Sequence, residues 1–226
     1  MTTRFAIVVE TGSKRTFVAA VDWPGWSRAA RDEAGAIDAL VAYGPRYAAV
    51  VSPVTAFEPP ADGSGLDIVE YLPGGSGTDF GVPSAFAAAD SRPMNEDELS
   101  LQITILQACH RAFDAAATRA VGVTLTTGPR GGGRPLEKIV RHVVEADQAY
   151  LQQLGTRPPR WGTETPEAYG ALILDLQTEA LGARVHGDTP PNPNAVKKLW
   201  SPRYFVRRAA WHVLDHAWEI EDRSSG

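Results

Sequence analysis

The sequence has little cysteine, no clustered basic segment and no long apolar run. Its single cysteine, Cys109, excludes an intramolecular disulfide framework and is typical of a protein in a reducing compartment. The formal net charge is −5, and lysine and arginine are scattered, so the basic patch of a nucleic-acid-binding protein is missing. No apolar stretch is long enough to predict a signal peptide or a membrane span. We therefore expect a cytoplasmic protein that has neither a nucleic-acid partner nor a membrane partner.

The first part of the chain has the pattern of a small α+β unit. Residues 5–10 and 16–22 are rich in β-branched side chains and flank the turn residues TGSKR, which predicts a hairpin. Residues 28–43 have apolar side chains at helical spacing and stop at a Gly-Pro pair, which predicts a helix. The run RYAAVVSPV at 46–54 is interpreted as a further strand.

A segment rich in proline, glycine and serine covers residues 56–93 and is interpreted as loop and linker. It is interrupted by LDIVEYL, which could add one more strand to the small unit. We place a domain boundary at its end, with residues 1–90 as the α+β module and residues 91–226 as a second domain.

The second domain has the pattern of four amphipathic helices, which predicts a four-helix bundle. The first helix begins at a capping box formed by Asn95 and Glu98. A glycine-rich loop, GPRGGGR, precedes the second helix; it lacks the Gly-Lys-Ser/Thr of a phosphate loop and is interpreted as a flexible linker. The predicted helices cover residues 95–122, 135–155, 165–182 and 201–223. The predicted fold class is therefore a two-part α+β chain.

Three histidines in these helices are the candidate metal ligands. His212 and His216 are four residues apart in the last helix, so both side chains lie on one face. His142 lies two turns into the second helix, beside apolar residues that face the bundle interior. Three neutral imidazoles that leave a coordination position open are typical of a catalytic zinc, nickel or iron(II) site. The alternative is that each is a hydrogen-bonded core histidine.

Two carboxylates follow these histidines at helical spacing. Glu145 lies three residues after His142, and Glu219 three residues after His216, so each could orient a ligand or move a proton. A carboxylate-bridged pair of metals would need more inward carboxylates than the pattern supplies. Asp215 is next to His216 but points elsewhere on the helix, which favours an ion pair.

Other charged or reactive side chains near these positions have simpler interpretations. For Arg207 and Arg208 we expect solvated side chains or salt bridges at the bundle end, with anion binding as the alternative. His110 and Asp114 are four apart, which predicts pairing on a helix surface. Cys109 lies among apolar helix residues and is expected to be an inert buried thiol.

Two segments, LEKIVRHVVEADQAYLQQLG and WSPRYFVRRAAWHVLDHAWEIEDR, resemble the DinB superfamily of four-helix metalloenzymes, over about residues 95–226. The resemblance implies that His142, His212 and His216 bind a divalent metal. It also implies a low-molecular-weight thiol such as mycothiol or bacillithiol as co-substrate, in a transferase or isomerase reaction. The acidic residues that follow His216 depart from the basic or polar run common in that family, which points to a different substrate.

The segments VDWPGWS and DEAGAIDAL resemble the HicB-like domain, over about residues 4–55. That resemblance implies a small α+β module of a kind usually found in antitoxins. The carboxylate cluster of a nuclease is not evident in this half, and no DNA-binding helix-turn-helix or ribbon-helix-helix pattern accompanies it.

Together these patterns predict a metal-dependent enzyme that activates a thiol or water against a small-molecule substrate. The N-terminal module would cover the pocket or pair two subunits in a homodimer. The alternatives are a metal-dependent hydrolase and a non-enzymatic protein that holds a metal and binds a partner through its HicB-like module.

Overall fold

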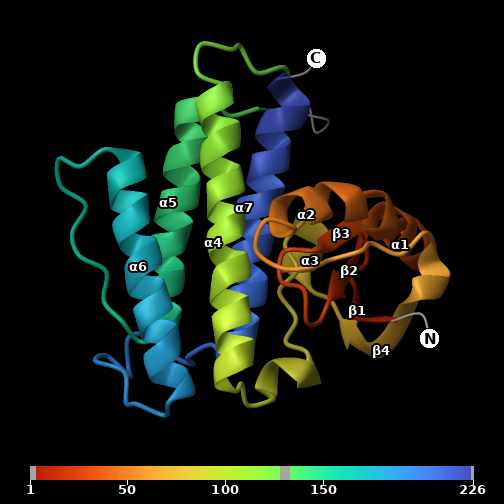
Figure 1. Ribbon diagram of the computed structural model, residues 1–226, viewed down its shortest axis with the longest axis horizontal. Helices are drawn as coiled ribbons and strands as arrows, with labels where there is room; N and C mark the ends of the chain where they lie inside the picture. Colours follow the sequence, from red (N-terminus) through yellow and green to blue (C-terminus); the bar gives the residue numbers. More distant parts are fainter. Residues whose placement is uncertain (1–3, 128–132, 225–226) are drawn as a thin grey trace.

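The computed structural model describes residues 4–127 and 133–224 and has an α+β fold. A small sheet with its own helices is followed by a bundle of long helices, and the sheet lies beside α7 of that bundle (Figure 1). Within the described residues, no helix combines the length and the apolar character needed to cross a bilayer.

The described residues form one mixed sheet with the strand order β3-β2-β1-β4. Strands β1 (Phe5–Thr11) and β2 (Thr16–Ala20) are antiparallel, which confirms the predicted hairpin, and β3 (Ser27–Ala30) pairs with β2. Strand β4 (Leu66–Pro73) contains the LDIVEYL run and pairs with β1 in parallel. A parallel pair needs a crossover connection, which the helices between β3 and β4 supply.

The prediction of a strand at residues 46–54 is wrong, because α2 (Gly44–Val51) occupies this segment. Pro45 lies in the first turn, where proline suits a helix, and Tyr47 and Val51 lie on one buried face. The Tyr47 hydroxyl donates a hydrogen bond to the Pro24 carbonyl, and its ring stacks with that of Trp26. Tertiary packing of this face therefore outweighs the β propensity of the valines.

The helix predicted at residues 28–43 begins later than expected. Residues 27–30 belong to β3, and α1 (Glu33–Ala42) starts after Asp32, whose side chain accepts a hydrogen bond from the Gly35 amide. Asp32 is therefore the N-cap, and the apolar residues before it pair with a neighbouring strand.

The predicted linker at residues 56–93 is more ordered than expected. It contains the short helices η1 (Gly63–Gly65), α3 (Ser76–Phe80) and η2 (Ala88–Ser91). The buried Glu10 carboxylate of β1 accepts hydrogen bonds from the Thr78 hydroxyl and the amides of Ser84 and Ala85. These bonds hold the segment that follows α3 against the sheet.

All four predicted bundle helices are present: α4 (Glu96–Arg119), α5 (Leu136–Gln153), α6 (Pro166–Val185) and α7 (Pro202–Ser224). The capping box of Asn95 and Glu98 is confirmed. Helix α6 continues past Gly182 and ends before Gly187, whose φ of 86° is the left-handed conformation that suits a helix end. Gly131 and Gly132 of the predicted flexible loop lie outside the described residues.

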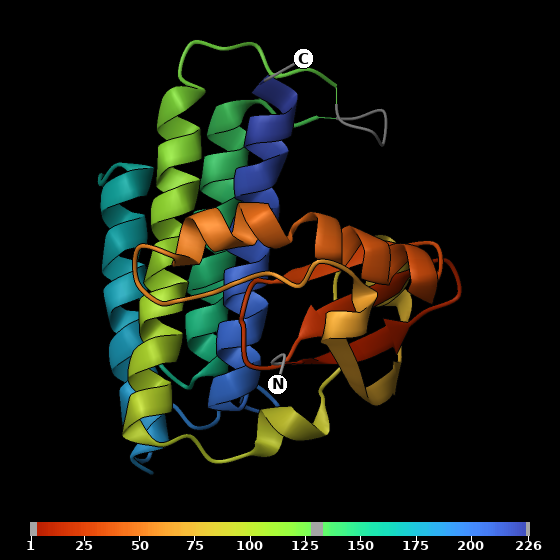
Figure 2. The same ribbon diagram turned by 45° about the vertical axis from the view of Figure 1, so that its right-hand side comes forward.

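Helix α7 lies at the centre of the molecule, between the sheet and the other bundle helices (Figure 2). Most of its side chains are buried, and one hydrophobic cluster joins both parts of the chain, from Trp26 and Tyr47 to Leu214. The turn at Gly25 has φ 93° and approaches α7 so closely that an added Cβ would lie 2.9 Å from Leu214 Cδ1. The division at residue 90 remains a prediction, and the two parts share a core across it.

Candidate metal centre

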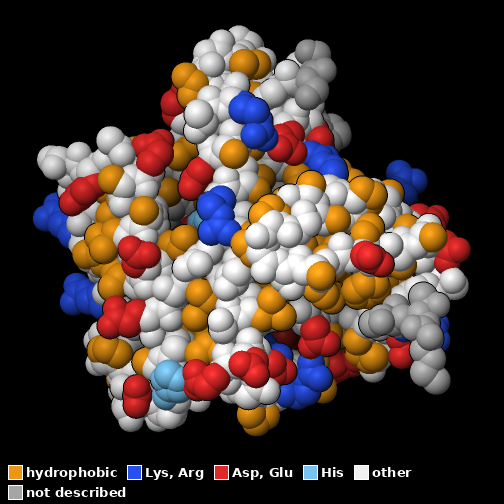
Figure 3. Space-filling view, in the orientation of Figure 1, with side chains coloured by type: hydrophobic (Ala, Val, Ile, Leu, Met, Phe, Trp, Pro, Cys, Tyr) orange, Lys and Arg blue, Asp and Glu red, His pale blue; other side chains and the backbone are white. Residues whose placement is uncertain are grey.

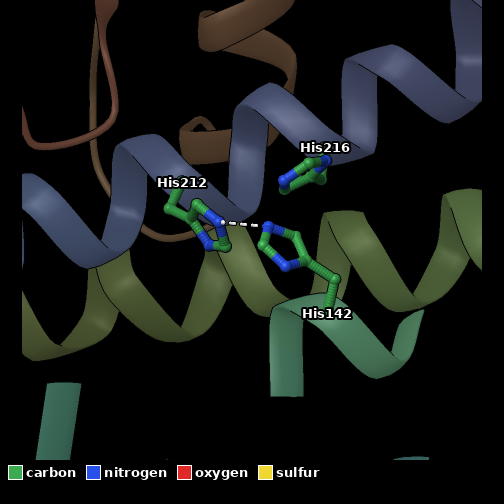
Figure 4. Close-up of side chains that lie close together, drawn as sticks. All are labelled: His142, His212 and His216. Atoms are coloured by element: carbon green, nitrogen blue, oxygen red, sulfur yellow. Dashed lines mark hydrogen bonds between the residues drawn. The ribbon is translucent and has the colours of Figure 1, made fainter. Parts of the chain in front are cut away.

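The three predicted ligands come together where α5 faces α7 (Figure 4). Pro202 occupies the first position of α7, and no glycine or further proline interrupts the helix, so His212 and His216 remain one turn apart on the same face. His142 projects from α5 toward both of them. His212 is buried, and His142 and His216 are half-buried, so the cluster is open on one side.

The spacing of the ring nitrogens suits one metal ion. Nε2 of His142 lies 3.3 Å from Nε2 of His212, and one nitrogen from each of the three rings lies within 4.8 Å of the others. Zinc–nitrogen bonds of about 2.0–2.1 Å in tetrahedral geometry place ligand nitrogens about 3.3–3.4 Å apart. The first pair already has this separation, and the 4.8 Å limit leaves His216 to move closer when a metal binds.

His216 is oriented by a carboxylate. Its Nδ1 lies 2.8 Å from Glu219 Oε2, and the other carboxylate oxygen of Glu219 accepts a hydrogen bond of 2.8 Å from Arg223 Nη1. The hydrogen bond from His216 and the Arg223 charge lower the pKa of Glu219. An anionic Glu219 fixes the proton of His216 on Nδ1, which leaves Nε2 with a free lone pair. This is the usual support for a metal-binding histidine.

The other two imidazoles are neutral at physiological pH. Burial, the neighbouring His216 and the charge of Arg134 lower the pKa of His142 to about 4. Burial also lowers the pKa of His212 well below its usual value, and His216 and Arg208 act in the same direction. A neutral imidazole has a lone pair to donate, so protons do not compete for these ligands at pH 7. Nδ1 of His212 has no hydrogen-bond partner among the described residues.

Arg207 and Arg208 are both buried, so the expectation of solvated side chains is wrong, whereas the expected salt bridge is present for Arg207. Arg207 makes a two-pronged ion pair with Asp90, at 3.1 and 2.5 Å. Arg208 lies over the rings of Tyr150 and Trp211, and its Nη1 has no hydrogen-bond partner among the described residues. No ion pair to Arg208 occurs within residues 4–127 and 133–224.

The two predicted carboxylates have different surroundings. Glu219 contacts His216 directly, whereas the half-exposed Glu145 accepts a hydrogen bond of 2.8 Å from Arg141 on the outer face of α5. Glu145 is near enough for its charge to raise the pKa of His142. Asp215 pairs with Arg28 at 3.4 Å, which confirms the predicted ion pair.

Sequence reasoning missed a second polar cluster inside the bundle. His110 does not pair with Asp114 on the surface; it is buried, and its Nε2 lies 3.9 Å from Oδ2 of Asp147. Asp147 continues the buried stripe of Ile139, Val143 and Val144 on α5, and this spacing is the signal that could have revealed it. Cys109 is a free, buried thiol whose pKa is raised by burial, as expected for an inert group.

No family model, curated protein or solved structure matches this chain. What the centre can do is therefore argued from its own atoms. It has three imidazoles, two of them neutral at pH 7, one carboxylate that orients the third, and an open side. This donor set suits a divalent metal that keeps a position free for another molecule.

Proposed function

We propose that this protein is a metal-dependent enzyme in which a DinB-like four-helix bundle, residues 91–226, activates a low-molecular-weight thiol against an electrophilic small molecule. His142, His212 and His216 would hold a zinc, nickel or iron(II) ion. The observation that carries the proposal is the convergence of these three imidazoles, one of them oriented by Glu219. The specific thiol chemistry comes from the resemblance in sequence to the DinB superfamily.

When bound, a divalent metal supplies Lewis acidity, which lowers the pKa of a bound thiol or water. Glu219 keeps His216 in the tautomer that can ligate, and Arg223 keeps Glu219 in place. Glu145 remains the candidate for moving a proton, because it is exposed to solvent one turn along α5 from His142.

The position of Arg208 suggests that the reactant at the three-histidine centre is negatively charged. Arg208 is 9% exposed as a residue, lies one helical turn before His212, and has a guanidinium nitrogen without a hydrogen-bond partner among the described residues. A buried positive charge lowers the free energy of a nearby anion, such as a thiolate. The Tyr150 hydroxyl is held protonated, since burial raises its pKa to about 12, so it could donate a hydrogen bond to the same anion.

We propose that the N-terminal module is HicB-like and covers the open side of the three-histidine centre. Its strand β2 reaches α7, where the Phe17 ring meets Trp211 edge to face, and Arg28 pairs with Asp215. These contacts lie on α7 next to Arg208 and His212. A role in pairing two subunits remains the alternative for this module.

The test begins with the metal content of protein purified without a histidine-rich tag. We expect near-stoichiometric metal in the wild type and in the control His186→Ala, and little in His212→Ala. His186 is a matched surface histidine, half-exposed and paired with Glu96 outside the bundle core. A wild type that stays metal-free after incubation with zinc, nickel and iron(II) would overturn the proposal.

Metal-loaded protein is then assayed for turnover of electrophilic substrates with and without added thiol. We expect turnover only when the thiol is present, with a loss of activity in His212→Ala. Turnover of ester or amide substrates without thiol would assign the centre to hydrolysis instead. Bound metal with neither activity would favour the non-enzymatic alternative.

A further inference from the structure

A large cavity lies inside the bundle, apart from the histidine centre. It has a volume of about 1140 Å³ and lies between the C-terminal half of α4 and the N-terminal halves of α5 and α6. None of the three candidate ligands is among the described residues that line it. In Figure 3 the surface is hollowed between the positions of α6 and α4, with acidic side chains beside the hollow. The cavity is therefore open to small molecules from solvent.

Two buried polar side chains line this cavity, and each has an atom that makes no hydrogen bond to the described residues. Asp147 is 2% exposed and His110 is 8% exposed, and both line the cavity wall. Oδ1 of Asp147 and Nε2 of His110 have no hydrogen-bond partner among the described residues. The distance from His110 Nε2 to the other carboxyl oxygen of Asp147, Oδ2, is 3.9 Å, which is too long for a hydrogen bond. Gln177 bonds the Asp147 carboxyl, but a buried carboxyl oxygen that has no partner is costly, so the placement of Oδ1 here points to a ligand.

The charge of the lining favours a cation. Acidic side chains outnumber basic ones, and of the two arginines Arg223 is already bonded to Glu219 and to the Thr126 carbonyl. The remaining wall is largely apolar. The acidic lining residues are Asp114, Glu137, Asp147 and Glu167, the basic ones are Arg111 and Arg223, and the apolar wall includes Phe113, Val140, Val143 and Leu174.

We propose that this cavity binds a small organic amine, whose ammonium group contacts Asp147 and whose apolar body lies against α4, α5 and α6. The ammonium would donate hydrogen bonds to Oδ1 of Asp147 and to His110 Nε2, the two unused acceptors. On binding, the Asp147 carboxyl would release its proton to solvent, and Asp114, on the same wall, supplies a second carboxyl group. An anionic ligand would instead meet this acidic excess in a desolvated space, which is unfavourable.

The pKa shifts of the side chains that line the cavity are those expected when no cation is bound. Burial raises the pKa of Asp147 to about 8, and burial together with Glu167 raises the pKa of Asp114. Burial lowers the pKa of His110 to about 4, so its imidazole is neutral and can accept a hydrogen bond. These are the directions expected when carboxyls in an apolar cavity lack a positive partner.

The probes are hexylamine, hexanol and hexanoate, which share an apolar chain and differ in charge. Binding to the full-length protein is measured by titration calorimetry. We expect hexylamine to bind at least about tenfold more tightly than hexanol, and hexanoate to bind most weakly. Equal binding of the three, or no binding of the amine, would overturn the proposal.

Two isosteric variants locate the amine. Asp147→Asn and Asp114→Asn should each weaken hexylamine binding, the former about tenfold or more, and leave hexanol unchanged. Asp175→Asn, on the exposed face of α6, is the matched control and should have no effect. Amine binding that is unaffected in both cavity variants would contradict the proposal.

A further variant separates the cavity from the metal centre, because an amine can also ligate a metal. His212→Ala should bind hexylamine as the metal-free wild type does. Loss of amine binding in His212→Ala would place the amine at the histidines and overturn the cavity site. The cavity proposal does not depend on the proposed enzyme function.

Discussion

Glu219 joins His216 to Arg223 through its two carboxylate oxygens, each at 2.8 Å. The three residues lie on successive turns of one helix, so the sequence spacing alone places them together. The arrangement makes the orientation of one candidate ligand depend on a single carboxylate.

Glu219→Gln should therefore weaken metal binding while leaving all three imidazoles in place. Loss of the charged hydrogen-bond acceptor is expected to reduce the metal affinity about 10–100-fold, as for other carboxylates that orient metal-binding histidines. The measurement is competitive titration with a chromophoric chelator. Glu145→Gln is the comparison: its carboxylate bonds Arg141 at the surface, so its metal affinity should equal that of the wild type. Equal affinity in both variants would show that Glu219 does not support the centre.

The buried Asp147 should make the protein less stable as the pH rises from 7 to 8. The pKa of this group is about 8 in the folded protein and about 4 in the unfolded chain. The folded state thus holds a proton that the unfolded state has released, and its stabilising contribution is lost as the pH rises through 8. The expected decrease in the free energy of unfolding is about 1 kcal/mol over this interval.

Urea unfolding at closely spaced pH values measures this change. In Asp147→Asn the decrease should disappear, because the amide does not titrate. His110, whose pKa is lowered to about 4, is neutral in the folded state, and loss of the remaining protons from its unfolded state, with a pKa of about 6.5, adds only about 0.1 kcal/mol in the opposite direction. A decrease of the same size in Asp147→Asn would assign it to another group.

The buried ion pair between Arg207 and Asp90 should be sensitive to loss of one partner. Arg207→Met leaves the Asp90 carboxylate buried without its counter-charge and should cost about 3–5 kcal/mol in the free energy of unfolding. The double variant Arg207→Met, Asp90→Asn should cost less than the sum of the single changes, since no charge is then left unpaired. Additive costs in denaturant unfolding would mean that the pair is not coupled.

Gly25→Ala tests the contact between the N-terminal turn and α7. An alanine there has unfavourable φ, and its Cβ would lie 2.9 Å from Leu214 Cδ1, so we expect a loss of about 2–3 kcal/mol. Gly187→Ala is the matched control, with a similar positive φ and no atom within 4 Å, and should cost only about 1 kcal/mol. Equal thermal shifts in the two variants would show that the turn does not pack tightly on α7.

The sequence was most informative where a pattern is local. The long helices, the capping box at Asn95 and the shared face of His212 and His216 depend on spacing within one helix, and the structure has each of them. The α2 segment shows the limit, because its valines favour a strand while Tyr47 is fixed by distant contacts with Pro24 and Trp26.

The features that the sequence did not predict depend on contacts between residues that are far apart in the chain. Arg207 and Arg208 are neighbours in sequence, yet only Arg207 meets Asp90, which lies in η2, more than a hundred residues away in the sequence. The unused Nη1 of Arg208 and the approach of Asp147 to His110 likewise depend on how separate helices pack. Spacing within one helix contains no information about such contacts.

Arg223 belongs to both the cavity wall and the support of the histidine centre. Its Nη1 contacts Glu219, its Nε donates to the Thr126 carbonyl, and its side chain lines the cavity. A ligand that shifts this guanidinium would thereby alter the orientation of His216. By thermodynamic linkage the influence is mutual: whatever factor the amine imposes on metal affinity, the metal imposes on amine affinity. If both ligands bind as proposed, this one side chain would couple their two equilibria.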